Sequence, residues 1–132
     1  MSGLLGFGLW ATSPGCGSPA LDRVPDGSWG GDHVSLSVST SSATVEFDCA
    51  HGLIEGPLVL DASGRFSVAG KFAKEHGGPI LEGEVEDVHP ALYEGATDGR
   101  TLTFTVRITD LGETRGPFVA VRGATPRVIK CL

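Results

Sequence analysis

The strongest constraint on the fold is a two-residue alternation of apolar and polar side chains. Successive side chains of a strand point to opposite faces, so this period is typical of antiparallel strands with one buried face. The alternation is clearest over 34–39, 43–49, 65–72 and 101–108. Weaker signals predict four further strands, at 53–60, 91–97, 118–122 and 128–132. No segment has helical periodicity longer than about two turns, so the pattern predicts an all-β fold.

Turn residues indicate how these strands connect. The chain holds 20 glycines and 8 prolines, which implies many short elements. Asp98-Gly99 is typical of a tight hairpin, and Asp61–Gly64 fits a type I turn that ends in a left-handed glycine. Eight sequential antiparallel strands predict a closed up-and-down barrel, because closure removes exposed strand edges. A two-sheet β-sandwich is the alternative.

Charge limits the partners. The net charge is −6, which disfavours binding to nucleic acid or to an anionic membrane surface. No apolar run reaches the length of a membrane span. Five acidic residues and the Gly77-Gly78-Pro79 turn fall within 75–89, which we interpret as a long irregular connection and a lid over one barrel end.

The first 25 residues differ in composition from the rest. An apolar run from Leu4 to Ala11 precedes Gly15-Cys16, which resembles a bacterial lipoprotein export signal, although no Lys or Arg precedes the run. We therefore expect residues 1–25 to be a leader and flexible tether, and residues 26–132 to form the barrel domain. Lipidation at Cys16 would be the one membrane attachment of an exported, periplasmic or cell-envelope protein. A disordered N-terminal arm is the alternative.

The other two cysteines are expected to pair. Cys49 and Cys131 lie on predicted strands near the two ends of the domain, and a closed barrel brings its last strand back beside its first. A Cys49–Cys131 disulfide would agree with export, since such bonds persist in oxidising compartments. Two buried free thiols are the alternative.

Gly27-Ser28-Trp29 resembles the Gly-x-Trp opening of lipocalins and related calycin barrels. The resemblance implies that Trp29 plugs one barrel end and that an arginine, here Arg122 or Arg127, stacks on it. The chain departs from that family in its length and in Leu111, where an aromatic residue is expected.

A second resemblance covers most of residues 28–132. It rests on Asp48–Gly52, Glu75–Pro79, His89–Gly95 and the terminal Lys130-Cys131-Leu132, which are similar to an uncharacterised family of small exported bacterial proteins. This resemblance implies no activity.

Three histidines lie near predicted strand ends or in the long connection. If His51, His76 and His89 converge, they could bind zinc or copper, the metals that imidazole favours. Their spacing matches no known metal motif, and isolated surface histidines are the plainer interpretation; no cofactor is predicted.

Glu75 and His76 are candidates for a general acid/base pair in a metal-free isomerase or cyclase. The pair needs an irregular backbone, which the glycines that follow permit. Hydrolase and nucleotide-binding motifs are absent, so the sequence favours a protein that is not an enzyme.

The inward-facing positions are almost wholly apolar, which excludes a deeply buried polar ligand. The sequence therefore predicts a binding or interaction barrel. Its partner would be a small hydrophobic ligand or a protein bound at the loop end, with Tyr93 and Trp29 as candidate ligand-binding residues. A barrel of this size can also fill with side chains, and six phenylalanines favour filling.

Overall fold

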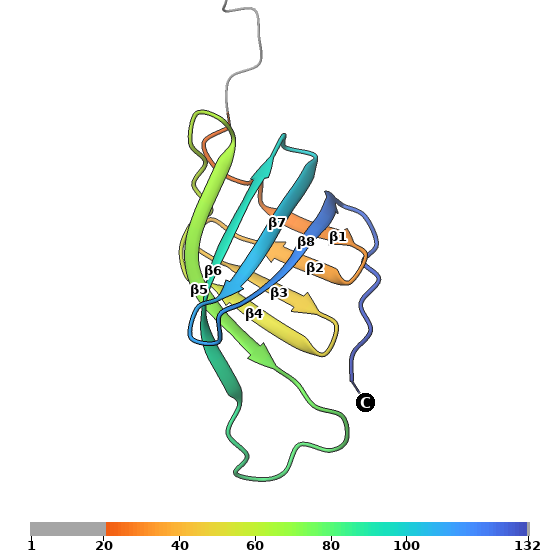
Figure 1. The fold of residues 1–132 in the computed structure, drawn as a ribbon. Helices are drawn as coiled ribbons and strands as arrows, with labels where there is room; N and C mark the ends of the chain where they lie inside the picture. The colour runs from red at the N-terminus through yellow and green to blue at the C-terminus, as the bar shows by residue number, and fades with distance from the viewer. Residues whose placement is uncertain (1–20, 132) are drawn as a thin grey trace, which may run out of the picture.

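The computed structural model describes residues 21–131, which form a closed antiparallel barrel without helices (Figure 1). Each strand pairs with the next in sequence, and β8 returns to pair with β1. The strands are β1 (Gly27–Gly31), β2 (Val34–Val38), β3 (Ala43–Phe47), β4 (Ala50–Ile54), β5 (Arg65–Lys74), β6 (Asp87–Thr97), β7 (Thr101–Ile108) and β8 (Glu113–Arg122). The predicted all-β barrel is confirmed. The expected leader and Cys16 lie in residues 1–20, outside the described part of the chain.

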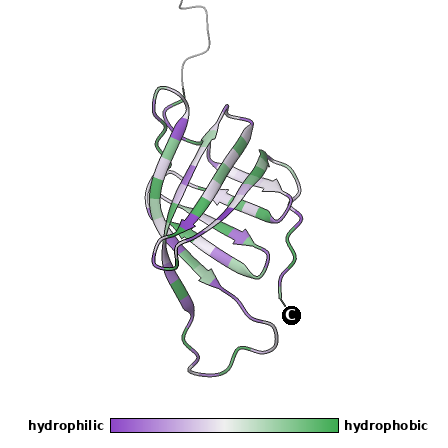
Figure 2. Ribbon diagram, viewed as in Figure 1, coloured by the Kyte–Doolittle hydropathy of each residue, from purple (hydrophilic) through white to green (hydrophobic). Residues whose placement is uncertain are grey.

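The alternation seen in the sequence becomes an inside and an outside. Val34, Leu36 and Val38 of β2 are buried while the serines between them are not, and Figure 2 shows the same alternation along the longer strands. Large side chains fill the interior, among them Trp29 and Tyr93, both 0% exposed. Burial of this apolar surface is the main stabilising contribution to the barrel.

Three strand predictions need correction. A strand at Gly27–Gly31 was not predicted, because two glycines and no period-two pattern hide it. The predicted strand at 53–60 is β4, Ala50–Ile54, followed by a loop that buries Leu58 and Leu60. Residues 128–132 were predicted as the last strand, but the described residues 128–131 form no strand. Just before them, Arg127 makes an isolated bridge to Asp32, next to β1. Cys49, expected on a strand, lies in the β3–β4 turn.

One end of the barrel, here called the closed end, is covered by two loops, 21–26 and 55–64, which bury the apolar side chains of Val24, Leu58 and Leu60. The Val24 N–H donates to the Leu58 carbonyl, and the Leu60 N–H donates to the Asp22 carbonyl. Val24 and Leu58 are at most 1% exposed, and the Trp29 indole beneath them donates to the Pro25 carbonyl at 3.1 Å. Residues 22–25 therefore belong to the barrel domain, which begins earlier than the predicted boundary at residue 26.

The opposite end, here called the open end, carries the β1–β2, β3–β4 and β7–β8 turns and the long 75–86 connection, which extends beyond the barrel (Figure 1). Strand lengths are unequal there. β1 has five residues and β8 has ten, and they pair at only three positions, ending at Gly31 and Ala120. The first half of β8 therefore continues past the end of β1 with a free edge. Pro117 lies on that edge and has no N–H to leave unpaired.

Among residues 21–131, the structure contains no helix long and apolar enough to cross a membrane.

Candidate functional site

A cavity of about 750 Å³ lies where β8 separates from β1; we call it the seam cavity. Its aromatic lining comes from Phe47 on β3, Phe72 on β5 and Phe118 on β8, strands that closure of the barrel brings together. The ring centroid of Phe47 lies 5.0 Å from that of Phe118 and 5.3 Å from that of Phe72. Apolar rings at the bottom of an open cavity suit an apolar or aromatic guest.

Two glycines of β1 make the junction beside the cavity tight. A Cβ on Gly31 would lie 1.9 Å from the Val119 carbonyl oxygen, and a Cβ on Gly30 would lie 2.2 Å from the Ala124 oxygen. Any side chain at either position would collide with backbone. The glycines therefore allow β8 to approach Gly31 and the C-terminal tail to approach Gly30. The wall of the cavity here is therefore bare backbone.

Polar groups form the rim: Asp32, His33, Asp48 and Arg115. Asp32 and His33 make up the β1–β2 turn, and Asp48 belongs to the β3–β4 turn. The last residue of each turn has a left-handed backbone, with φ of 68° at His33 and 52° at Cys49. Such conformations are costly for residues other than glycine, so surrounding contacts must hold them.

The C-terminal tail (123–131) supplies those contacts. The His33 N–H donates to the Arg127 carbonyl at 2.7 Å, and the Cys49 N–H donates to the Ile129 carbonyl at 3.3 Å. A Cys49–Cys131 disulfide then joins the tail to the β3–β4 turn, with 4.9 Å between the two Cα atoms and a sequence separation of 82. The predicted pairing is present in the structure, although the tail, and not a last strand, brings Cys131 to Cys49.

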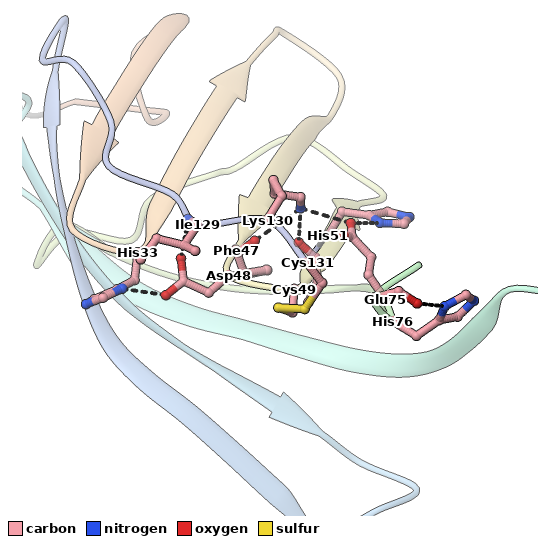
Figure 3. The surroundings of a disulfide bond; sticks show 12 residues. His33, Phe47, Asp48, Cys49, His51, Glu75, His76, Ile129, Lys130 and Cys131 are labelled. Atoms are coloured by element: carbon pink, nitrogen blue, oxygen red, sulfur yellow. Dashed lines mark hydrogen bonds and ion pairs between the residues drawn. A yellow bond between two sulfur atoms is a disulfide. The ribbon is translucent and has the colours of Figure 1, made fainter. Parts of the chain in front are cut away.

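Lys130 fixes the tail from the other side (Figure 3). Its ammonium donates to the carbonyls of Phe47 and Ala50 and to the carboxylates of Glu46 and Glu75, all within 3.1 Å. Partial burial acts to lower the pKa of Lys130, but the two carboxylates outweigh it and the pKa is raised. With its hydrogen-bonding capacity filled, this ammonium holds structure in place and is not free for a ligand.

The rim carboxylate Asp48 is likewise engaged. Its Oδ1 accepts the Ile129 N–H at 2.8 Å, and its Oδ2 lies 2.5 Å from His33 Nδ1. The hydrogen bond from Ile129, aided by His33, lowers the pKa of Asp48. The group is therefore an anion over the neutral pH range and anchors the tail to the cavity rim.

The histidines predicted as metal ligands have separate partners. His51 Nδ1 lies 2.7 Å from Glu75, His76 contacts Glu84, and His89 lies 2.9 Å from both Asp87 and Asp110. Across residues 21–131, no group of three or more His, Cys, Asp or Glu side chains is arranged to hold a metal ion. His51 and His76 line one cavity of about 530 Å³, which His89 does not line.

Glu75 and His76 also have separate partners. Partial burial acts to raise the pKa of Glu75, but hydrogen bonds from Lys130 and His51 outweigh it and the pKa is lowered. The backbone carbonyl of Gly77, with the Glu84 carboxylate, raises the pKa of His76. No hydrogen bond joins these two side chains, because each has its own partner, but both line a cavity of about 530 Å³.

The predicted ligand residues lie deep in the barrel. Tyr93 donates its hydroxyl to the Lys71 carbonyl at 2.7 Å, and burial raises the pKa of this phenol. Neither Tyr93 nor Trp29 lines the seam cavity. A Cβ on Gly52 would lie 1.9 Å from the Tyr93 hydroxyl, so a missing side chain on β4 makes room for the ring.

The expected arginine on Trp29 is not found. Arg122 donates to the Asp26 carbonyl, and Arg127 pairs with Asp32. In the part of the chain that the structure describes, the cation–π contact is between Arg115 and Phe72, whose ring centroid lies 5.2 Å from the guanidinium carbon.

Sequence reasoning missed Arg115 and Phe118 because they precede or begin a strand predicted only from residue 118. The Gly116-Pro117 pair conceals the continuity of β8 by breaking its alternation, where two residues of β8 lie opposite one residue of β7.

Comparison of the chain with family models, with curated proteins and with solved structures finds no match. The fold and the site together define a small closed β-barrel that is plugged at one end and has an aromatic cavity at the other.

Proposed function

We propose that this protein is a binding barrel that takes a small apolar molecule into the seam cavity. The observation that carries the proposal is the open cavity of about 750 Å³ lined by Phe47, Phe72 and Phe118. This volume lies in the range of small-molecule sites, which are typically apolar with a few polar groups that fix orientation. The rim residues supply those polar groups.

The filled interior argues for this location. Trp29, Tyr93 and Phe104 are each at most 2% exposed and pack inside the strands. A ligand in the barrel axis would have to displace them, whereas the seam cavity already opens to solvent. A second cavity, of about 690 Å³ on the side of the barrel, has Phe66 as its one aromatic residue and is the weaker candidate.

We further propose that the protein acts outside the cytoplasm. The Cys49–Cys131 disulfide supports this, because it closes a long loop of chain and disulfides of this kind persist in oxidising compartments. Intact mass before and after reduction of protein from the producing cell tests the bond. A protein recovered with both thiols free would contradict this part of the proposal.

The binding proposal is tested with N-phenyl-1-naphthylamine, an uncharged fluorescent apolar probe. We expect saturable enhancement of its fluorescence by the intact protein, and loss of that enhancement in Val119→Trp. Val119 lines the cavity and is 50% exposed, so a larger side chain there obstructs the cavity without entering the core.

Leu111→Trp is the matched control, because Leu111 is 41% exposed at the same end and does not line the seam cavity. Equal probe binding by the wild type and both variants would contradict a site at the seam. Absence of saturable binding by the wild type would contradict the proposed function itself.

A further inference from the structure

We propose that the ligand of the seam cavity is an aromatic carboxylate, with its ring against the phenylalanines and its carboxylate on the Arg115 guanidinium. This inference rests on the proposed function and narrows it from apolar molecules in general to one chemical class. Among the described charged groups that line the cavity, Arg115 is the one that keeps unused hydrogen-bond donors.

The acidic groups of the rim are already paired. Asp32 accepts a hydrogen bond from Arg127 Nε at 2.6 Å. Asp48 accepts one from the Ile129 N–H at 2.8 Å and contacts His33 at 2.5 Å. A cationic ligand would have to displace these partners, and release of Ile129 would also free the tail. The rim therefore does not favour a cation.

Arg115 is in the opposite situation. Among the described residues its guanidinium makes one side-chain hydrogen bond, from Nη2 to Glu113 at 3.4 Å, which is close to the limit for such a bond. The Arg115 side chain is 42% exposed, and its guanidinium carbon lies 5.2 Å from the centroid of the Phe72 ring. The stacked guanidinium thus keeps N–H donors directed along its plane, where a carboxylate can accept two of them side by side.

The lining explains why the body of the ligand should be aromatic. Three phenylalanine rings meet at the cavity with centroid separations of 5.0 Å and 5.3 Å and tilted planes. Phe118 is the partly buried ring of the three, so a further flat ring can pack against it in the tilted or offset geometry that aromatic pairs prefer.

The test compares two molecules of nearly identical shape, 2-naphthoate and uncharged 2-naphthamide, by isothermal titration at neutral pH. We expect the intact protein to bind 2-naphthoate at least about tenfold more tightly. Arg115→Met should remove this preference, and Arg115→Lys should retain part of it, because lysine keeps the charge and loses the planar fork. Arg107→Met, at an exposed arginine that pairs with Glu94 on the barrel wall, is the matched control and should keep the full preference.

The outcomes separate this inference from the proposed function. Equal affinity for the acid and the amide, with both still blocked by Val119→Trp, would overturn the carboxylate and leave the apolar site standing. Binding of decanoate as tight as that of 2-naphthoate would overturn the aromatic part. If neither naphthyl compound nor the uncharged fluorescent probe bound, the proposed function would fail and the inference with it.

Discussion

At the closed end of the barrel two loops bury apolar side chains near Trp29, whereas at the open end a charged tail passes beside a cavity. Val24, Leu58 and Leu60 are at most 8% exposed, and backbone hydrogen bonds join their loops. The open end instead relies on a disulfide and on the Lys130 ammonium. The difference shows that apolar packing and backbone hydrogen bonds seal one end, while a disulfide and an ammonium group hold the other end around an opening.

If the closed end is purely structural, damage there should cost stability and leave the site intact. We expect Trp29→Ala to lower the free energy of unfolding by about 3–5 kcal/mol, because it removes a fully buried indole and leaves a cavity. Urea denaturation measures this loss. Probe affinity of the folded fraction should not change, and a fall in affinity together with normal stability would break the comparison.

Damage to the disulfide should affect stability and binding together. We expect replacement of both Cys49 and Cys131 by serine to lower the free energy of unfolding by about 2–4 kcal/mol, since the 82-residue separation closes a long loop in the unfolded chain. Probe affinity should also fall, because Asp48 on the cavity rim adjoins Cys49. Unfolding and fluorescence titrations of one sample test both effects. Unchanged probe affinity would show that the attachment of the tail does not support the binding site.

The Lys130 links allow a finer version of the same test. We expect Lys130→Met to lower the free energy of unfolding by about 1–2 kcal/mol, because two carbonyls and two carboxylates lose their donor in a partly exposed place. Amide exchange should rise in the β3–β4 turn and in the tail. Exchange that rises equally at the closed end would show that the two ends are not independent.

The smallest expected effect concerns His89, which lies between Asp87 and Asp110 at the open end. The hydrogen bond that His89 donates to Asp110 and the charges of both carboxylates raise the pKa of His89 above its ordinary value of 6.5. The folded state therefore binds the proton more tightly, so this contribution is full below pH 6.5 and is lost as the pH rises through the folded-state pKa.

Accordingly, His89→Gln should lower the melting temperature slightly at pH 5.5 and hardly at all at pH 8.5. In an Asp110→Asn background the pH-dependent part of that difference should shrink. A difference between wild type and variant that grew with pH would contradict the assigned pairing.

Particular residues show how far the sequence could go. The alternation in β2, β3, β5 and β7 predicted those strands, because a half-buried strand must alternate. β1 was missed because its Gly30 and Gly31 are selected for close backbone contact and not for side-chain packing. Among the site residues, Cys49 and Cys131 were identified because they remained once Cys16 was assigned to the leader. Arg115 and Phe118 were not identified, because nothing near them in the sequence indicates the ring or the cavity that they contact.

The sequence by itself determined that the chain is all-β, that its strands follow one another as hairpins, and which side chains face inward. These properties depend on residues one or two positions apart, where the chain geometry fixes the outcome. The tertiary structure decided the partner of each histidine, the path of the tail and the existence of the seam cavity. Those depend on the short β1–β8 pairing and on contacts between residues as far as 80 positions apart, such as Lys130 and Ala50, which form only when the barrel closes.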